Sequence, residues 1–330
     1  MASATEHLRD TPAAARDAWN RFWFRPTDPA TLGVIRICAG LLLLRTHWVW
    51  IANHDAFFGP QAWLSAAGRA AFNEGSWSSW SWSHLLWCDS LPFDSTGLIW
   101  TLHVVALIAM AMLTLGLMTR AAAVASFLFT VSFANRAMGS TFGLDGVNAM
   151  LALYLMIGPA GAAFSLDNLI RKRRGKPPVG ESVSANIAIR LIQLHMCYIY
   201  LSAALAKFAG ETWWDGTAMW LAIANYEYQS IDVTFLAHWP LLLNFLTHVT
   251  LYWELSYCAL VWLPRFRPGV ILLAVPVHLG ISLCMGMVEF GLVMLVGNAA
   301  FISPWIIRKV IPGGDGVQRK DAKTQRRKGR

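Results

Sequence analysis

Charged residues are scarce in this sequence. Asp, Glu, Lys and Arg together make up 14% of its 330 residues, whereas a soluble globular domain contains about 25%. Apolar residues make up 56%, and the mean hydropathy is +0.44. This composition excludes an intrinsically disordered chain and argues against an ordinary soluble domain. The 17 Trp and 17 Phe residues favour extended contact with a membrane interface instead.

Cysteine is also sparse. The five residues are scattered along the chain and are Cys38, Cys88, Cys197, Cys258 and Cys284. None of them forms a CxxC pair, so nothing in the sequence predicts a zinc site or a framework of disulfides. Four of them lie inside apolar runs, where we expect small buried hydrophobic side chains.

The signature motifs of soluble enzymes are missing. The sequence has no GxSxG, HExxH or Walker A motif, and no GxGxxG at a strand–helix junction. No period of about 20–50 residues recurs, which excludes solenoids and propellers, and no inverted repeat of the transporter kind is evident. Residues 1–30 lack the apolar core of a signal peptide and form an amphipathic stretch with four arginines. We therefore expect no cleavable signal and a first span that inserts by itself.

Long apolar segments are what the sequence does contain, and a spanning helix needs about 20 mostly apolar residues. We expect eight spans, at residues 33–52, 97–118, 120–136, 145–163, 186–209, 240–263, 268–286 and 288–307. The predicted fold class is all-α, a polytopic membrane bundle in one domain over residues 31–307. An amphipathic segment at 1–30 precedes it, and a disordered basic tail at 308–330 follows it. The stretch 165–185, which contains a basic cluster and two prolines, is expected to be a solvated loop.

The basic residues indicate the orientation of the spans. With the N-terminus inside, the inner segments contain 21 Lys and Arg residues, and the outer segments contain only Arg69 and Arg136. The positive-inside rule therefore places both termini in the cytoplasm. Most of the net charge of +8 comes from the tail, which we expect to contact anionic lipids rather than nucleic acid. Together these features predict an integral protein of a bacterial cytoplasmic membrane.

Two of the predicted outer loops are long and aromatic. Residues 53–96 include the Trp-rich stretch SWSSWSWSHLLW, and residues 210–239 include WWDG and NYEYQ. Such loops are typical of amphipathic interfacial segments anchored by Trp and Tyr. They also fit lids over a site that opens outward, and the two interpretations are compatible.

Polar residues inside the spans are the main functional signal, because a charge at that depth costs at least about 2.5 kcal/mol. In the predicted topology most of them lie at similar depth, in the outer half of the membrane. They are Arg45, His47, Asp145, Asn148, Lys207, His248, Glu254, His278 and Glu289. Their gathering at one level predicts a site that opens to the outer side.

Several of these residues also have simple structural explanations. Lys207 lies near a helix end and can extend to the lipid headgroups, and Asp145 can cap the fourth span. Glu254 can form a structural ion pair with Arg45 or Lys207. His278 can be an interhelical hydrogen-bonding residue.

Lys207 is nevertheless the strongest candidate for chemistry. The small residues Ser202, Ala203, Ala204 and Ala206 precede it, and small residues let helices approach closely. The lysine would then be partly desolvated, and desolvation favours the neutral amine that acts as a base.

Five stretches of the chain follow one another in a familiar order. They are LGVIRICAGLLLLRTHWVW in the first span, ANRAMGSTFGLDGVNAML (134–151), YIYLSAALAKFAGETWWDGTAMW (198–220), LTHVTLYWELSYCALVW (246–262) and VPVHLGISLCMGMVEFGLVML (275–295). Together they resemble the HTTM (horizontally transferred transmembrane) domain, the membrane part of the vitamin K-dependent gamma-carboxylase family, over residues 25–306.

The resemblance implies the chemistry of that family. Its carboxylases form an epoxide from reduced vitamin K with oxygen, and Lys207 matches the lysine implicated in deprotonating the hydroquinone. His278 matches a family histidine in a later apolar segment. Another carboxylase histidine falls near Asp145, where this chain has none. The carboxylases also continue with a large extramembrane region, for which we expect no counterpart here.

The predicted function is that of a carboxylase-like membrane enzyme acting on a quinol or another lipid-soluble substrate. Lys207 would be the base, and His278 and Glu254 would position groups or relay protons. The residues expected to bind substrate are Arg45, Arg136, Asp145, Asn148, Trp213, Trp214 and His248. Arg45 or Arg136 would steady a developing oxyanion, and the two tryptophans would shape the mouth of the pocket.

No metal or nucleotide is expected, and a reduced quinone is the cofactor that the resemblance implies. The expected partners are membrane lipids and a lipid-soluble small molecule. The alternative is a non-catalytic membrane component, either transporter-like or an accessory subunit, that uses the same polar cluster for binding.

Overall fold

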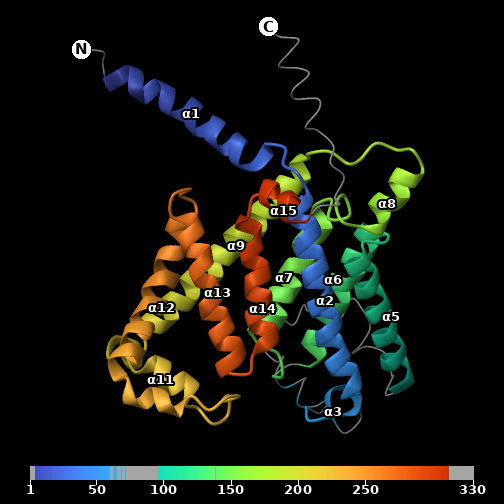
Figure 1. Cartoon of the computed structure of the whole chain (residues 1–330). Coiled ribbons are helices and arrows are strands. Elements are labelled where there is room, and N and C mark those ends of the chain that lie inside the picture. The colour runs from blue at the N-terminus through green and yellow to red at the C-terminus, as the bar shows by residue number, and fades with distance from the viewer. Residues whose placement is uncertain are drawn as a thin grey trace. The chain divides into compact units, whose positions relative to one another are not determined.

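The computed structural model describes residues 4–59, 96–137 and 139–311, with a few residues between 62 and 71. Within these ranges the chain is helical and has no strand, and Thr27 and Ser182 form an isolated antiparallel bridge (Figure 1). The all-α prediction is confirmed for this part of the chain. The Trp-rich stretch of the first outer loop, Arg69 and most of the basic tail lie outside the described residues.

Each of the eight predicted spans corresponds to a helix. In chain order these helices are α2 (Ala30–Ala52), α5 (Thr96–Leu115), α6 (Thr119–Arg136), α7 (Gly143–Ile157), α9 (Val183–Phe208), α12 (Pro240–Leu260), α13 (Arg267–Cys284) and α14 (Val288–Asn298). The smaller elements are α1 (Ala4–Phe24), α3 (His54–Phe58), α8 (Leu166–Arg173), α10 (Glu211–Trp214), α11 (Ala218–Ile223), η2 (Thr234–His238), η3 (Ala299–Phe301) and α15 (Pro304–Val310).

Fewer helices are long and apolar enough to cross a membrane by themselves. In the described part of the chain they are Ala30–Ala52, Gly97–Leu115, Val183–Phe208 and Arg267–Cys284. A fifth is added if the bent pair Val288–Phe301 and Pro304–Val310 counts as one span, and α7 is apolar but shorter. These helices support a membrane protein. The count of eight spans and the cytoplasmic position of both termini stay predictions.

The segment 165–185 differs from the loop that its charges predict, because it begins with α8. Ser165 caps this helix, since its hydroxyl oxygen accepts a hydrogen bond from the backbone N–H of Asn168 at 3.0 Å. Residues 174–182 then form an irregular connection that is mostly exposed. A cap and a helix of 8 residues are weak signals in a sequence whose most visible feature is a run of basic residues.

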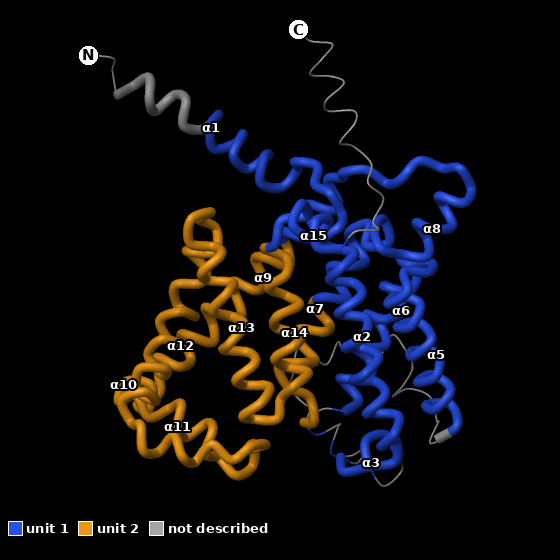
Figure 2. Tube along the Cα trace, in the orientation of Figure 1, with its two compact units in different colours: residues 1–138, 151–190, 302–330 blue, residues 139–150, 191–301 orange. Residues whose placement is uncertain are grey.

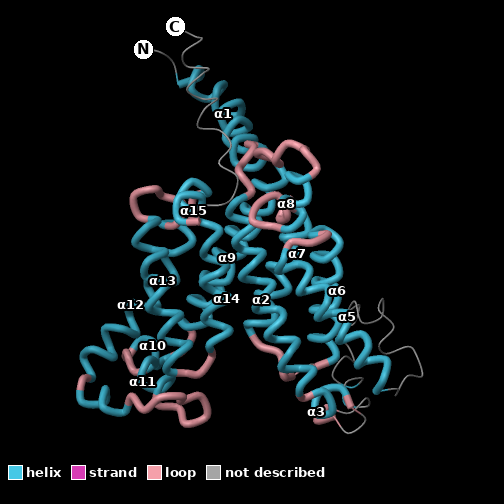
Figure 3. The backbone as a smooth tube through the Cα atoms, turned by 45° about the vertical axis from the view of Figure 1, so that its right-hand side comes forward, coloured by secondary structure: helices cyan, strands magenta, loops and turns pink. Residues whose placement is uncertain are grey.

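The chain forms two compact units (Figure 2). Unit 1 contains residues 1–138, 151–190 and 302–330, and unit 2 contains residues 139–150 and 191–301. Unit 1 therefore holds α1, α2, α3, α5, α6, α8 and α15, and unit 2 holds α10 to α14. The boundaries between the units fall within α7 and α9, and Figure 3 shows the helices of both units from a second direction.

The core of unit 1 is the packing of α2 against α5 and of α5 against α6. Leu43, Met110 and Phe133 are among the side chains buried there. Gly40 lies where α2 and α5 are close, because a Cβ atom at this position would be 2.4 Å from Thr114 Oγ1 and 3.0 Å from Thr114 Cα. The contact between the two helices therefore requires glycine.

Two charged side chains hold the turns of unit 1. Asp167 of α8 accepts hydrogen bonds from Met118 N and Thr119 N, both at 2.8 Å, and so caps α6 with a negative charge. Arg36 of α2 is fully buried and donates to Ala160 O at 3.3 Å. Because its bonds satisfy backbone carbonyl groups, Arg36 has a structural role in this unit.

In unit 2, α13 packs against α14, and α12 packs against α11 and α13. The backbones of α13 and α14 approach closely at Gly291, where a Cβ atom would lie 2.4 Å from His278 O. Polar side chains of α12, α13 and α14, together with those of α9, form the candidate site.

Candidate functional site

A chain of buried polar side chains runs through unit 2. Tyr200 of α9 and His278 of α13 form a hydrogen bond between Oη and Nε2 at 2.7 Å. Asn298 of α14 donates from Nδ2 to Tyr200 Oη at 2.8 Å, and its Oδ1 accepts from Tyr257 Oη of α12 at 2.7 Å. All four side chains are at most 3% exposed. Four helices are thus joined by side-chain hydrogen bonds in an apolar interior.

An ion pair lies in the same unit. Lys207 Nζ of α9 donates to Glu254 Oε2 of α12 at 2.7 Å, and the two side chains are 23% and 10% exposed. The ammonium group also lies 5.2 Å from the ring centroid of Trp213, a distance suited to a cation–π contact. The pair is therefore partly shielded from solvent by an aromatic side chain at its exposed end.

The ion pair and the polar chain share two helices. Tyr200 and Lys207 both belong to α9, and Glu254 and Tyr257 both belong to α12. Packed rings lie beside them, since the Tyr200 ring is 5.0 Å from that of Trp253. We treat the six polar residues as one site, the α9–α14 polar cluster, made of Tyr200, Lys207, Glu254, Tyr257, His278 and Asn298.

One ring nitrogen in this cluster is open. His278 Nδ1 has no hydrogen-bond partner among the described residues, although the side chain is only 3% exposed. A buried polar atom without a partner is unusual in a native protein and needs an explanation. A ligand hydroxyl or an ordered water at Nδ1 would supply the missing bond.

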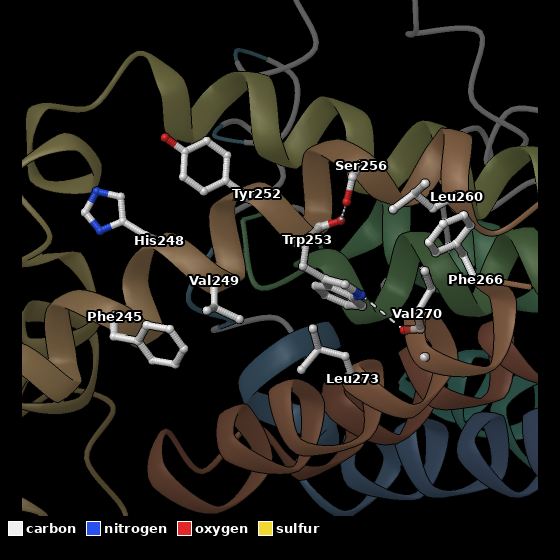
Figure 4. A pocket seen from close by; sticks show the side chains of 11 residues that line it. Phe245, His248, Val249, Tyr252, Trp253, Ser256, Leu260, Phe266, Val270 and Leu273 are labelled. Atoms are coloured by element: carbon white, nitrogen blue, oxygen red, sulfur yellow. Dashed lines mark hydrogen bonds between the residues drawn. The ribbon is translucent and has the colours of Figure 1, made fainter.

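An apolar groove lies between α12 and α13, and Trp253 is one of the residues that line it (Figure 4). Its volume is about 570 Å³, and Phe245, His248, Tyr252 and Leu273 are among the residues that line it. Trp253 points toward α13, where its indole N–H donates to Val270 O at 3.1 Å. The same indole is thus a wall of the groove and a neighbour of Tyr200.

The structure brings the three predicted catalytic residues into one unit. Lys207 and Glu254 form the pair that the sequence allowed as a structural explanation of Glu254. His278 is an interhelical hydrogen-bonding residue, as its structural explanation proposed. The structure shows where these three side chains lie and what they contact. Their catalytic roles stay predictions.

The predicted binding residues of unit 2 have different surroundings. Trp213 contacts the Lys207 ammonium, whereas Trp214 is 50% exposed and donates to Phe208 O at 2.9 Å. His248 lines the groove, and its Nδ1 is 2.9 Å from Asn244 O. Only Trp213 among these residues therefore has a described contact with the ion pair.

Asp145 and Asn148 are buried in α7. Asp145 Oδ2 accepts a hydrogen bond from the backbone N–H of Phe142 at 2.9 Å, so the carboxylate caps the start of its own helix. This contact matches the structural explanation for Asp145. The binding roles of both residues stay predictions.

Arg45 and Arg136 belong to unit 1. Arg45 is an exposed residue of α2, and Arg136 at the end of α6 donates to Phe58 O at 3.5 Å. Their predicted role in steadying an oxyanion is untested by these contacts.

Tyr200, Tyr257 and Asn298 are the site residues that sequence reasoning missed. Tyr200 precedes Lys207 by seven residues, which puts both on one face of α9. This spacing was the one available signal, because neither tyrosine carries a formal charge that would mark it inside an apolar run. Asn298 follows an apolar run in the middle of the predicted span 288–307, and as an uncharged amide it was not marked as a site residue.

No three His, Cys, Asp or Glu side chains are grouped to hold a metal ion in the ranges that the structure describes. The groups available in the α9–α14 polar cluster are an amine, a carboxylate, an imidazole, an amide and two phenols. These groups exchange protons and bind hydroxyl groups.

Comparison with known proteins assigns a family to the chain. Residues 24–305 match the model of the HTTM domain. No curated protein and no solved structure gives a match. The matched range includes every residue of the α9–α14 polar cluster and begins near the start of α2. Since this match covers most of the chain, the protein is a membrane protein of the HTTM family.

Proposed function

We propose that this protein is a membrane enzyme in which Lys207 and Glu254 exchange a proton with the hydroxyl group of a lipid-soluble substrate. The observation that carries the proposal is the 2.7 Å contact between Nζ and Oε2 of two side chains with little exposure. An ion pair in such surroundings loses much of its hydration and is weak evidence of a purely stabilising role.

The geometry supports a simple proton transfer. Moving one proton from Nζ to Oε2 turns the ion pair into a neutral amine and a carboxylic acid, and a low-dielectric interior favours the neutral forms. The amine then accepts the proton of a substrate hydroxyl, so an O–H bond breaks, an N–H bond forms and the substrate becomes an oxyanion. The new ammonium group lies beside the oxyanion and stabilises it.

The neighbouring polar residues are suited to orienting the substrate. Tyr200 holds one nitrogen of the His278 ring, and Asn298 holds Tyr200 in turn. The imidazole is thereby positioned with Nδ1 open for a ligand hydroxyl. We assign His278 to binding the substrate.

A quinol is the substrate class that we favour. Its hydroxyl groups are acidic enough for an amine base, and its ring and tail are apolar. The apolar groove beside Trp253 supports a substrate that reaches the protein from the lipid phase. The resemblance to the gamma-carboxylases implies a reduced quinone as well. We place this activity at the outer side of a bacterial cytoplasmic membrane.

The test combines lipid identification with turnover. Wild-type protein, Lys207→Ala, Glu254→Gln and the control Lys176→Ala are purified, and their bound lipids are identified by native mass spectrometry. We expect a quinone to be retained by the wild type and the control and lost in Lys207→Ala. Oxygen-dependent oxidation of added quinol should fall by about 10²-fold or more in both site variants. Equal turnover in Lys207→Ala and wild type would contradict the proposal.

A non-catalytic component of a membrane complex is the second candidate, and one observation favours it. The chain from Tyr257 through Asn298 and Tyr200 to His278 satisfies most of its own hydrogen bonds, as a structural network does. On this alternative, Lys207→Ala would leave lipid content unchanged, and a cross-linked partner protein would be the specific finding.

A further inference from the structure

Three helices of unit 1 share a composition that differs from that of the spans. They are α1, α8 and α15, and each combines basic residues with exposed apolar side chains. They lie at the same end of unit 1, opposite the end that carries α3 (Figures 1 and 2). None of their basic residues belongs to the α9–α14 polar cluster, so this surface is independent of the proposed function.

Side-chain and backbone bonds tie this end of unit 1 together. Asp28, between α1 and α2, forms an ion pair with Arg308 of α15 through two bonds of 2.6 and 2.8 Å. Asn186, near the start of α9, donates to Phe22 O at 2.7 Å and to Trp23 O at 2.9 Å. The end of α1 is therefore attached to α9, and α15 is attached to the link between α1 and α2.

α1 has two distinct faces. Trp19, Phe22 and Trp23 have the spacing of one helix face, and the Trp19 and Trp23 rings are 5.9 Å apart. Arg21 lies on another side of α1, Arg25 directly follows the helix, and both are exposed. Trp19 remains 61% exposed. An exposed tryptophan on a basic amphipathic helix is typical of a segment that lies in a membrane interface.

α8 and α15 continue this pattern. Arg173 and Arg174 are exposed at the end of α8, and Leu169 of the same helix is 44% exposed. In α15, Trp305 is 60% exposed and lies 5.4 Å from the ammonium group of Lys309. Tryptophan beside lysine suits the boundary between acyl chains and headgroups.

We propose that α1, α8 and α15 form a basic collar that binds the headgroups of anionic phospholipids in the membrane that holds the protein. Charge complementarity selects this occupant, because among the described side chains of these helices exposed arginines and lysines outnumber the exposed carboxylate Asp17. The exposed tryptophans select a lipid surface over a free phosphate or a nucleic acid, because they need an apolar phase next to the charges.

The test compares lipids that differ only in headgroup charge. Full-length protein is placed in nanodiscs of phosphatidylcholine with or without phosphatidylglycerol of the same acyl chains. Binding of phosphatidylglycerol is measured by native mass spectrometry, and amide exchange is followed in residues 13–24. We expect selective retention of phosphatidylglycerol and slower exchange in α1 when it is present.

Charge variants assign the binding to the collar. Arg21→Gln/Arg25→Gln removes two exposed charges and should weaken phosphatidylglycerol binding at least about fivefold, because each basic residue near the surface contributes about that factor. The control Arg265→Gln removes an exposed arginine of unit 2 and should have no such effect. The basic tail is present in every variant, so it contributes equally to each measurement.

Three results would overturn the proposal. The first is equal binding of the two lipids by the wild type. The second is the same loss of binding in Arg265→Gln as in the double variant. The third is displacement of phosphatidylglycerol by RNA or an acidic peptide at equal charge, which would assign the collar to that partner instead.

Discussion

The two units bury histidine in different ways. In unit 2, His278 is bonded to Tyr200 within a chain of polar side chains. In unit 1, His47 and His103 are fully buried. Neither Nδ1 nor Nε2 of either ring has a hydrogen-bond partner among the described residues. His103 instead stacks on Phe133, with ring centroids 3.8 Å apart and an interplanar angle of 3°. His278 is part of a polar network, whereas His47 and His103 are packed as aromatic rings.

The difference shows which buried polar residues point to function. A polar side chain that only packs can be replaced by an apolar side chain of the same shape at little cost. A polar side chain that is hydrogen-bonded to other buried side chains, as Asn298 is to Tyr200 and Tyr257, cannot, because each lost bond leaves a buried partner unsatisfied. Sequence inspection treats His47 and His278 alike, since both lie in apolar runs.

Removing one member of the ion pair should have the largest effect on stability. Glu254→Ala leaves the Lys207 ammonium without its carboxylate, and we expect a loss of about 3 kcal/mol in the free energy of unfolding. Lys207→Met/Glu254→Leu removes both charges and should be closer to the wild type than the single variant. Thermal unfolding in detergent measures both. A double variant as unstable as Glu254→Ala would show that packing, not charge, holds α9 to α12.

The histidine comparison gives the second prediction. Asn298→Ala in unit 2 removes bonds to Tyr200 and Tyr257, and we expect a loss of about 2 kcal/mol. His103→Phe in unit 1 removes no hydrogen bond that the structure describes and should change stability by less than about 1 kcal/mol. The comparison would fail if His103→Phe were the more destabilising of the two in the same unfolding assay.

The space around helix glycines gives a third and smaller difference between the two units. Gly40→Ala places a methyl group 2.4 Å from Thr114 Oγ1, and the strain should cost about 1–2 kcal/mol. Gly280→Ala in α13 of unit 2 meets no atom within 4 Å and should be neutral or stabilising, because alanine favours the helix. Urea or thermal midpoints of the two variants, measured side by side, check this.

The ion pair between Asp28 and Arg308 should give the smallest effect, and one that depends on pH. Burial raises the pKa of Asp28, but the bonds from Arg308 and Ala30 N–H outweigh it and hold the pKa below its ordinary value. The stabilisation is therefore present above the unfolded pKa and is lost as the pH falls through the folded pKa. At neutral pH it should be below about 1 kcal/mol.

The measurement is the thermal midpoint as a function of acidic pH. Asp28→Asn should lower the midpoint at neutral pH and flatten its dependence on pH in the acid range. Asp17→Asn, which changes an exposed carboxylate of α1, serves as the control and should retain the wild-type slope.

Much of the architecture was predictable because it depends on local patterns. The helices α2, α5 and α13 follow directly from apolar runs of the length that a membrane requires. Lys207, Glu254 and His278 were identified because charged and titratable residues stand out in such runs. α8 was missed, since the pattern of a short capped helix is masked by its basic residues.

The partners of these residues could not be predicted, because they come from different helices. Tyr200 and Asn298 are 98 residues apart, and Lys207 and Glu254 are 47 residues apart. The sequence left Glu254 with either Arg45 or Lys207 as a partner, and the packing of α9 against α12 selects Lys207. Tyr257 and Asn298 have no local feature that marks them as part of a site.

By itself the sequence determined that this is an apolar, helical, membrane-type chain with most of its basic residues outside the predicted spans. Composition and periodicity are enough for that, because the membrane and the helix each act on residues close in sequence. Only the tertiary structure decided which buried polar groups meet. A hydrogen bond of 2.7 Å depends on the register and rotation of two packed helices, and neither quantity is written in the local sequence of either one.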